Sequence, residues 1–233
     1  MPADELRLLA DGRVDIVGRV VESSNLTFIA DLTLGDEYGW AIYKPQVGER
    51  PLWDFEPGLH RRERAAYLLS EALGWGIVPA TVVRDDAPLG VGSFQWFVEA
   101  DPREHYFTIV EDAPQSHDDL RRIAVFDFVA NNTDRKSGHV LRDRDGRVWG
   151  IDHGLCFSPE FKLRTVIWDF GGEPIPSTLL DGLAALADAV PNDLADLLAV
   201  REAEALRERA RLLLDRPVLP VDRSGRRVPW PLV

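Results

Sequence analysis

Three strand-like runs within the first 45 residues are the feature that most restricts the fold of this chain. They cover residues 14–22, 27–34 and 38–45, and short polar turns separate them. Because gaps this short join strands that are neighbours in space, the runs predict antiparallel hairpins. The chain is therefore expected to begin with an antiparallel sheet.

The pattern changes to mainly helical after about residue 100. In the first part we expect a helix over 60–73 and two more strands over 80–84 and 91–98. In the second part we expect helices over 117–131, 178–190 and 193–214 and a hairpin of strands 139–142 and 147–151. The sequence thus predicts an α+β fold with an N-terminal part (1–99), a C-terminal part (100–214) and an extended or mobile Pro- and Arg-rich tail (215–233).

Charge and cysteine content exclude several classes of function. The chain of 233 residues has 39 acidic and 27 basic side chains, a formal charge of −12, which argues against nucleic acid or an anionic membrane as partner. The single cysteine, Cys156, allows no internal disulfide and is expected to be a core residue. The acidic start of the chain does not resemble a signal peptide, and no run approaches the roughly 20 apolar residues that span a bilayer. We therefore expect a cytoplasmic protein without stable membrane insertion.

The segment over 126–157 carries the most chemical information. It contains Asn-Thr-Asp-Arg-Lys-Ser-Gly-His (132–139), then the expected hairpin, then Ile-Asp-His-Gly (151–154). Such a hairpin would bring Asp134 and Asp152 close together. One carboxylate could then accept a proton while the other holds a divalent cation through its oxygens.

These motifs resemble the catalytic and metal-binding loops of the phosphatidylinositol 3/4-kinase-like and HipA-like branch of the protein-kinase-like superfamily, and the whole chain is similar to an uncharacterised actinobacterial group within it. The resemblance implies a two-lobed kinase fold, with an antiparallel-sheet N-lobe and a mainly helical C-lobe, and phosphoryl transfer from ATP. It implies that Asp134 orients the acceptor hydroxyl and takes its proton, that Arg135 or Lys136 steadies the phosphoryl group, and that Asp152 binds the metal.

The resemblance also implies a nucleotide site. Lys44 is the only lysine before residue 136 and is the expected phosphate-binding lysine, with Glu63 as its helical partner. The loop Ser23-Ser24-Asn25 takes the place of a phosphate-covering loop, without its usual glycines. A hinge strand that includes Phe97 and Val98 is expected to face adenine, although its aromatic side chains also fit a core role.

His139 departs from the family pattern, which has asparagine as a metal ligand at this position. Three interpretations stay open: His139 binds Mn²⁺ in place of Mg²⁺, it orients Asp152, or it leaves a metal site unfilled. Asn132 is an alternative ligand or a residue that shapes the loop, and His153 is structural or a phosphate contact. The rival functions are a nucleotide-binding pseudokinase with a regulatory or scaffold role, transfer of AMP, and a purely structural protein. The acceptor, a protein or a small molecule, and the oligomeric state are not indicated.

Overall fold

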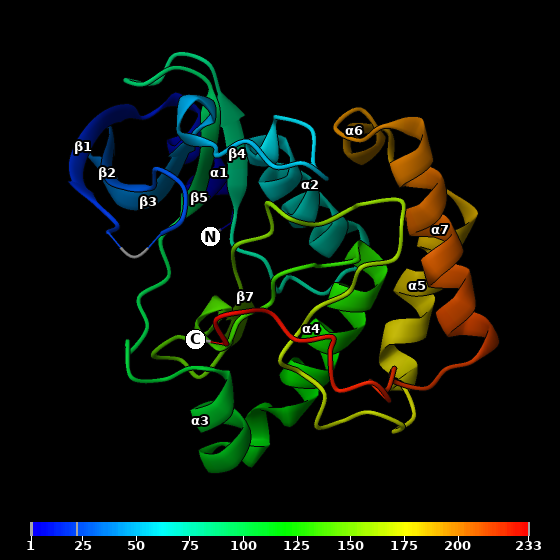
Figure 1. Cartoon of the computed structure of the whole chain (residues 1–233). Coiled ribbons are helices and arrows are strands. Elements are labelled where there is room, and N and C mark those ends of the chain that lie inside the picture. The colour runs from blue at the N-terminus through cyan, green and yellow to red at the C-terminus, as the bar shows by residue number, and fades with distance from the viewer. Residues whose placement is uncertain (1, 22, 233) are drawn as a thin grey trace.

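The computed structural model of the protein describes residues 2–21 and 23–232. Its N-terminal part is built on a five-stranded sheet in which all neighbouring strands are antiparallel (Figure 1). In spatial order the strands are β1 (Arg13–Arg19), β2 (Phe28–Leu34), β3 (Glu37–Pro45), β5 (Gly92–Trp96) and β4 (Thr81–Arg84). The sheet confirms the expected antiparallel hairpins.

Side chains along β3 alternate between the two faces of the sheet, and this places Lys44 on the face opposite the buried one. Ala41 and Tyr43 are fully buried on one face, while Ile42 and Lys44 point to the opposite face. Helix α1 (Pro2–Asp11) packs against the sheet, and helix α2 (Leu59–Ala72) packs against β4 and β5.

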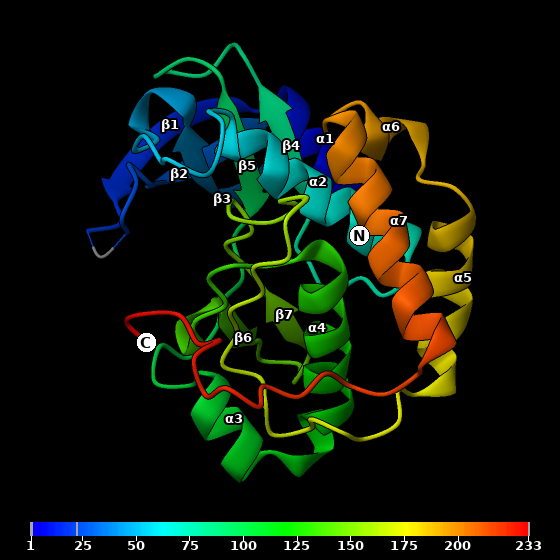
Figure 2. The same ribbon diagram turned by 45° about the vertical axis from the view of Figure 1, so that its right-hand side comes forward.

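The C-terminal part surrounds helix α4 (His117–Ala130), whose apolar residues are buried on most sides. The small hairpin of β6 (Val140–Arg142) and β7 (Val148–Gly150) lies beside α4 (Figure 2). The remaining helices are α3 (Tyr106–Asp112), α5 (Leu180–Asp188), α6 (Asn192–Ala195) and α7 (Val200–Asp215). Within the described residues, no helix has the length and apolar character needed to cross a membrane.

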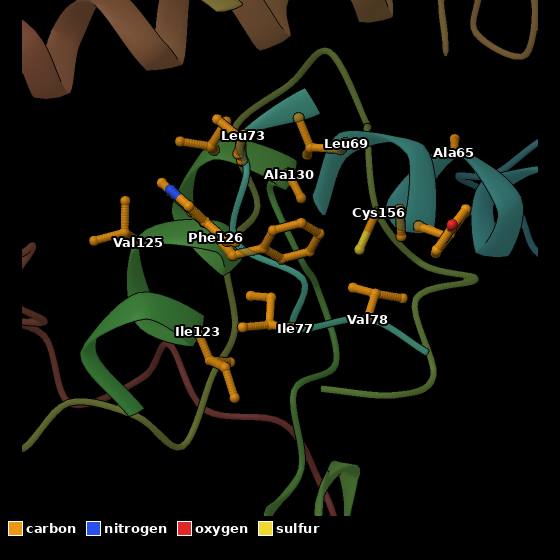
Figure 3. Packing of buried hydrophobic residues seen from close by; sticks show 14 of the residues in the cluster. Ala65, Leu69, Leu73, Ile77, Val78, Ile123, Val125, Phe126, Ala130 and Cys156 are labelled. Atoms are coloured by element: carbon orange, nitrogen blue, oxygen red, sulfur yellow. The ribbon is translucent and has the colours of Figure 1, made fainter. Parts of the chain in front are cut away.

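A shared hydrophobic core joins the two parts. Leu69 of α2, Phe126 and Ala130 of α4, and Val78 from the segment after α2 belong to one buried cluster (Figure 3). Cys156 lies in the same cluster with no exposed surface, as the sequence predicts. The segment that follows Asp152 is thus anchored in the core.

The structure confirms the expected α+β, two-lobed fold class and corrects several details. Helices α1 and α3 were not expected. The helix expected over 193–214 is divided into α6 and α7, because residues 196–199 leave the helical path and Leu197 and Leu198 pack against the core. The proposed boundaries after residues 99 and 214 stay predictions.

The tail is extended, as expected, but it also packs on the fold. It runs along the C-terminal part (red in Figure 2) and is fixed there by backbone hydrogen bonds. Leu219 is 2% exposed and exchanges backbone hydrogen bonds with Gly172 and Glu173. The Pro and Arg content suggested an extended or mobile segment, but apolar residues spaced between them bury against the fold.

Candidate active site

One cavity between the two parts collects most of the residues that the sequence singled out. It is lined by the loop between β1 and β2, the end of β3, α2, and the segments after α4 and β7. The predicted residues among its lining are Ser23, Ser24, Asn25, Lys44, Glu63, Asp134 and Asp152. The fold therefore brings together side chains from five separate parts of the chain.

Lys44 lines this cavity and lies between two carboxylates. Its Nζ lies 2.5 Å from Oε1 of Glu63 and 2.7 Å from Oδ1 of Asp152. Burial favours the neutral amine, but the charges of Asp152 and Glu63 outweigh it and raise the pKa of Lys44. Lys44 therefore stays a cation, which is the form that can bind phosphate oxygens.

Glu63 is held on α2 as a buried acid. Its side chain is 3% exposed, and its Oε2 accepts a hydrogen bond from the backbone N–H of His153 at 3.0 Å. Burial raises the pKa of Glu63, and the Lys44 cation opposes this shift. The pair links β3, α2 and the segment after β7 in one contact network.

Asp152 lies where the chain turns sharply after β7. Its φ of 58° is in the left-handed region, which costs a non-glycine residue about 1–3 kcal/mol. Burial opposes ionisation of this carboxyl group, but the Lys44 cation holds its pKa below the usual range. The unusual backbone directs an ionised carboxylate to Lys44.

His139 faces Asp152 at the other side of the same carboxylate. Its Nε2 is 3.3 Å from Oδ2 of Asp152, and its Nδ1 is 3.0 Å from the backbone oxygen of Asp134. Burial lowers the pKa of His139 to about 4, against the opposing effect of Asp152. A neutral imidazole that donates from Nδ1 to Asp134 leaves the Nε2 lone pair beside the Asp152 carboxylate.

Asp134 lies in the loop between α4 and β6. Its Oδ2 is 3.3 Å from Nζ of Lys136, and its backbone N–H donates to Oδ1 of Asn132 at 3.0 Å. Burial raises the pKa of Asp134 even though Lys136 acts in the opposite direction. A carboxylate with a raised pKa is a better proton acceptor than an exposed aspartate.

Arg135 does not lie where the sequence placed it. Its side chain has no exposed surface, and its guanidinium binds Asp127 through Nε at 2.9 Å and Nη2 at 2.8 Å. Its Nη1 donates to the backbone oxygens of His139 and Ile151, at 3.1 and 2.6 Å. Arg135 therefore supports the loop from its buried side. It has no donor directed at a phosphoryl group in the cavity.

Asn132 and His153 also have internal partners. Asn132 is fully buried and donates to Oδ1 of Asp127 at 3.0 Å, which favours the loop-shaping interpretation over a metal ligand. His153 is fully buried, and its Nε2 lies 2.7 Å from Nη2 of Arg135, which favours the structural interpretation over a phosphate contact.

Asp127 is the residue that the sequence interpretation missed. It is fully buried on α4, where it contacts Asn132, Arg135 and Oγ1 of Thr165. A single acid between two phenylalanines in the apolar run Phe126–Phe128 was the available signal, because a buried carboxylate requires partners.

The loop over 23–25 covers the cavity without glycine. The hydroxyl groups of Ser23 and Thr27 are 2.8 Å apart, and Oδ1 of Asn25 accepts a hydrogen bond from the backbone N–H of Arg50. These side-chain hydrogen bonds hold in place a loop that lacks the glycines usual in the family.

The hinge residues Phe97 and Val98 line a different cavity, of about 490 Å³, together with Trp40 and Trp96. This cavity shares no lining residue with the one around Lys44. Phe97 donates its backbone N–H to Trp40, whereas the N–H of Val98 has no acceptor among the described residues. Trp40 and Lys44 lie on the same face of β3, about 13 Å apart along the strand.

The oxygen and nitrogen donors at Asp152 and His139 suit a divalent cation. Among the described residues there is no cluster of three or more His, Cys, Asp or Glu side chains arranged for a metal. A carboxylate with one neighbouring imidazole fits an ion that takes its remaining ligands from phosphate and water.

Comparison with known proteins agrees with this geometry. The family model for phosphatidylinositol 3- and 4-kinase matches residues 59–214. The chain belongs to the phosphatidylinositol 3- and 4-kinase family. The match begins at α2 and includes Glu63, Asp134 and Asp152, whereas β3 with Lys44 lies before it.

Two relatives match this chain over very different fractions of its length. Protein Rv2133c of Mycobacterium tuberculosis (strain ATCC 25618 / H37Rv) is 42% identical over 265 residues, covering 98% of this chain and 95% of the relative. Phosphatidylinositol 4-kinase gamma 3 of Arabidopsis thaliana is 34% identical over 77 residues, covering 30% of this chain and 13% of that protein.

Solved structures show the same kinase-like fold. A Golgi casein kinase with Mn/ADP bound has a TM-score of 0.57 at 14% identity, covering 92% of this chain and 74% of that chain. A proinflammatory kinase of Helicobacter pylori, CtkA, has a TM-score of 0.53 at 12% identity, covering 91% and 94%. The fold and family thus identify a kinase-like phosphotransferase framework.

Proposed function

We propose that this protein is an ATP-dependent phosphotransferase that acts on a hydroxyl group. The observation that carries the proposal is the position of Lys44, within 2.7 Å of both Glu63 and Asp152 in a cavity that Asp134 also lines. A cation for phosphate, an acid for a metal and a base for the acceptor are the groups that phosphoryl transfer requires.

Lys44 would bind the α- and β-phosphates, and Glu63 would keep its ammonium group in place. The Ser23–Asn25 loop would cover the phosphates with its backbone N–H groups and hydroxyls. The adenine would lie toward the hinge, where the free N–H of Val98 offers a hydrogen bond and β3 spans the distance to Lys44. The exposed edge of the Trp40 and Phe97 pair, 5.8 Å between ring centroids, borders this position.

Asp134 would orient the acceptor hydroxyl and take its proton as the new oxygen–phosphorus bond forms and ADP leaves. Lys136, 3.3 Å from Asp134, is the cation that remains to steady the transferring phosphoryl group, since Arg135 is buried. Because this chemistry depends mainly on positioning and charge, the rigid support of the loop by Arg135 is itself relevant to rate.

Asp152 and His139 would hold Mg²⁺ or Mn²⁺. The cation would neutralise phosphate charge and fix the orientation of the nucleotide. His139 supplies a nitrogen where the family usually supplies an amide oxygen, and this favours Mn²⁺, because Mg²⁺ prefers oxygen ligands.

Calorimetry with ATP and ADP, in Mg²⁺ or Mn²⁺, combined with an assay of phosphate release and transfer from γ-labelled ATP, tests the proposal. We expect metal-dependent nucleotide binding and turnover, and loss of turnover in Asp134→Ala with nucleotide binding retained. Binding with no turnover under any metal would instead indicate the pseudokinase, and a product that gains AMP in mass spectrometry would indicate adenylyl transfer. Absence of nucleotide binding would refute the proposal.

A further inference from the structure

The outer side of the loop that carries Asp134 is positively charged, although the protein as a whole has a formal charge of −12. Lys136 lies in this loop, Arg164 lies in the segment hydrogen-bonded to it, and Arg226 and Arg227 lie in the tail beside that segment. These four cations form a local positive surface, which the negative charge of the whole protein does not explain.

Arg164 is held against the loop by its backbone. Its N–H donates to the oxygen of Asn132 at 2.9 Å, and its own oxygen accepts from the N–H of Arg135 at 3.0 Å. The backbone N–H of Val166 donates a hydrogen bond to the backbone oxygen of Arg135. This bond completes a parallel β-bridge between Arg135 and Thr165.

This bridge determines the direction of the neighbouring side chains. Arg135 and Thr165 both point inward, where each contacts Asp127. Because side chains alternate along paired extended segments, Asp134 and Arg164 both point outward, and their backbones lie about 5 Å apart. The Arg164 side chain therefore begins beside the proposed catalytic base.

The guanidinium group of Arg164 is exposed and has no carboxylate partner among the described residues. The neighbouring lysines differ, since Lys162 lies 3.3 Å from Asp54 and Lys136 lies 3.3 Å from Asp134. A guanidinium with free donors binds carboxylate or phosphate through two parallel hydrogen bonds.

The tail borders the same surface and adds to its charge. The backbone oxygen of Arg227 accepts from Thr165 at 3.1 Å, and that of Leu232 accepts from Ser137 at 2.8 Å. The tail is thus fixed on both the 164–165 segment and the Asp134 loop. Arg226 and Arg227 are exposed next to Thr165, and the one acid of this stretch, Asp222, is occupied by bonds to the backbone of Ser224 and Arg227.

We propose that the acceptor carries an anionic group, a carboxylate or a phosphate, close to its reacting hydroxyl, and that Arg164 binds this group. This inference rests on the proposed function, because it assigns to Asp134 the hydroxyl of the same acceptor. Arg226 and Arg227 add a second, longer-range attraction along the tail.

The test compares charged and neutral probes that are otherwise matched. Binding is measured by calorimetry for a serine peptide flanked by glutamates against its glutamine twin, and for glycerol 3-phosphate against glycerol, with and without ADP and metal. We expect at least one anionic probe to bind ten or more times tighter than its neutral twin. The probe that binds shows whether the anion comes from an acidic polypeptide or from a small phosphorylated alcohol.

Variants then assign the preference to one side chain. Arg164→Gln should reduce the preference for the anionic probe about tenfold, Arg164→Lys should retain part of it, and Arg201→Gln, an exposed arginine on α7, should leave it unchanged. Equal binding of charged and neutral probes by the native protein, or a preference that survives Arg164→Gln, would overturn the inference. ADP with metal is titrated separately into each variant, so failure of the proposed function is distinguished from failure of this inference.

Discussion

The guanidinium of Arg135 forms a bidentate ion pair with Asp127, and neither side chain has any surface exposed to solvent. The same guanidinium binds the backbone oxygens of His139 and of Ile151, which directly precedes Asp152. One buried arginine therefore sets the relative position of the two proposed metal ligands.

Arg135→Met should lower the free energy of unfolding by about 3–5 kcal/mol, because it leaves the Asp127 carboxylate buried without a cation. Urea denaturation followed by fluorescence measures this change. The double variant Asp127→Asn/Arg135→Met should lose less than the sum of the two single variants, because the unpaired charge is removed. A loss below about 1 kcal/mol in Arg135→Met would show that the pair does not support the fold as described.

His139→Asn should change the metal preference of the nucleotide complex. Replacing the imidazole nitrogen by an amide oxygen favours Mg²⁺ over Mn²⁺, so the ratio of turnover in Mn²⁺ to turnover in Mg²⁺ should fall several-fold. Steady-state assays with each metal measure the ratio. Asp152→Asn is the comparison, since it should lose turnover with both metals, and an unchanged ratio in His139→Asn would exclude the histidine from the metal site.

Glu63→Gln should weaken the use of nucleotide without unfolding the protein. It removes one of the two carboxylates that hold the Lys44 ammonium group, and charge-assisted hydrogen bonds of this kind contribute about 1.5–3 kcal/mol, so kcat/KM for ATP should fall about 10- to 100-fold. Glu71→Gln, an exposed glutamate on the same helix, is the matched control. Equal kcat/KM values for the two variants would show that Lys44 does not depend on Glu63 to bind nucleotide.

Leu219→Ala tests whether the tail is part of the folded structure. Leu219 is 2% exposed, so its truncation should cost about 2–5 kcal/mol of stability. Val221→Ala, at a position 53% exposed, should change stability by less than about 0.5 kcal/mol. Similar midpoints of denaturation for the two variants would indicate that the tail does not pack as described.

Local patterns were sufficient to predict the sheet, α2, α4 and the small hairpin, because each depends on hydrophobic periodicity and on short turns. The chemistry of Lys44, Asp134 and Asp152 could be anticipated from the motifs, and the structure places all three in one cavity. Their roles stay predictions.

The sequence-based predictions failed where contacts with distant segments determine the direction of a side chain. Arg135 follows Asp134 in the sequence, but its pairing with Thr165, thirty residues later, turns it inward to Asp127. A motif gives the order of residues and does not say which of them faces the cavity. The packing of the extended tail could not be predicted for a similar reason, because the partners of Leu219 lie at residues 172–173.

The helix that carries Glu63 is attached to the opposite part of the protein along its outer edge. Arg62 donates to the backbone oxygen of Cys156 at 2.6 Å and pairs with Glu202 of α7 at 2.6 Å, and Arg61 donates to the backbone oxygen of Asp196 at 2.8 Å. Swinging α2 outward would break all three contacts together. We therefore expect the Lys44–Glu63 pair to be present before any nucleotide binds, because these contacts fix the position of α2 from its outer edge.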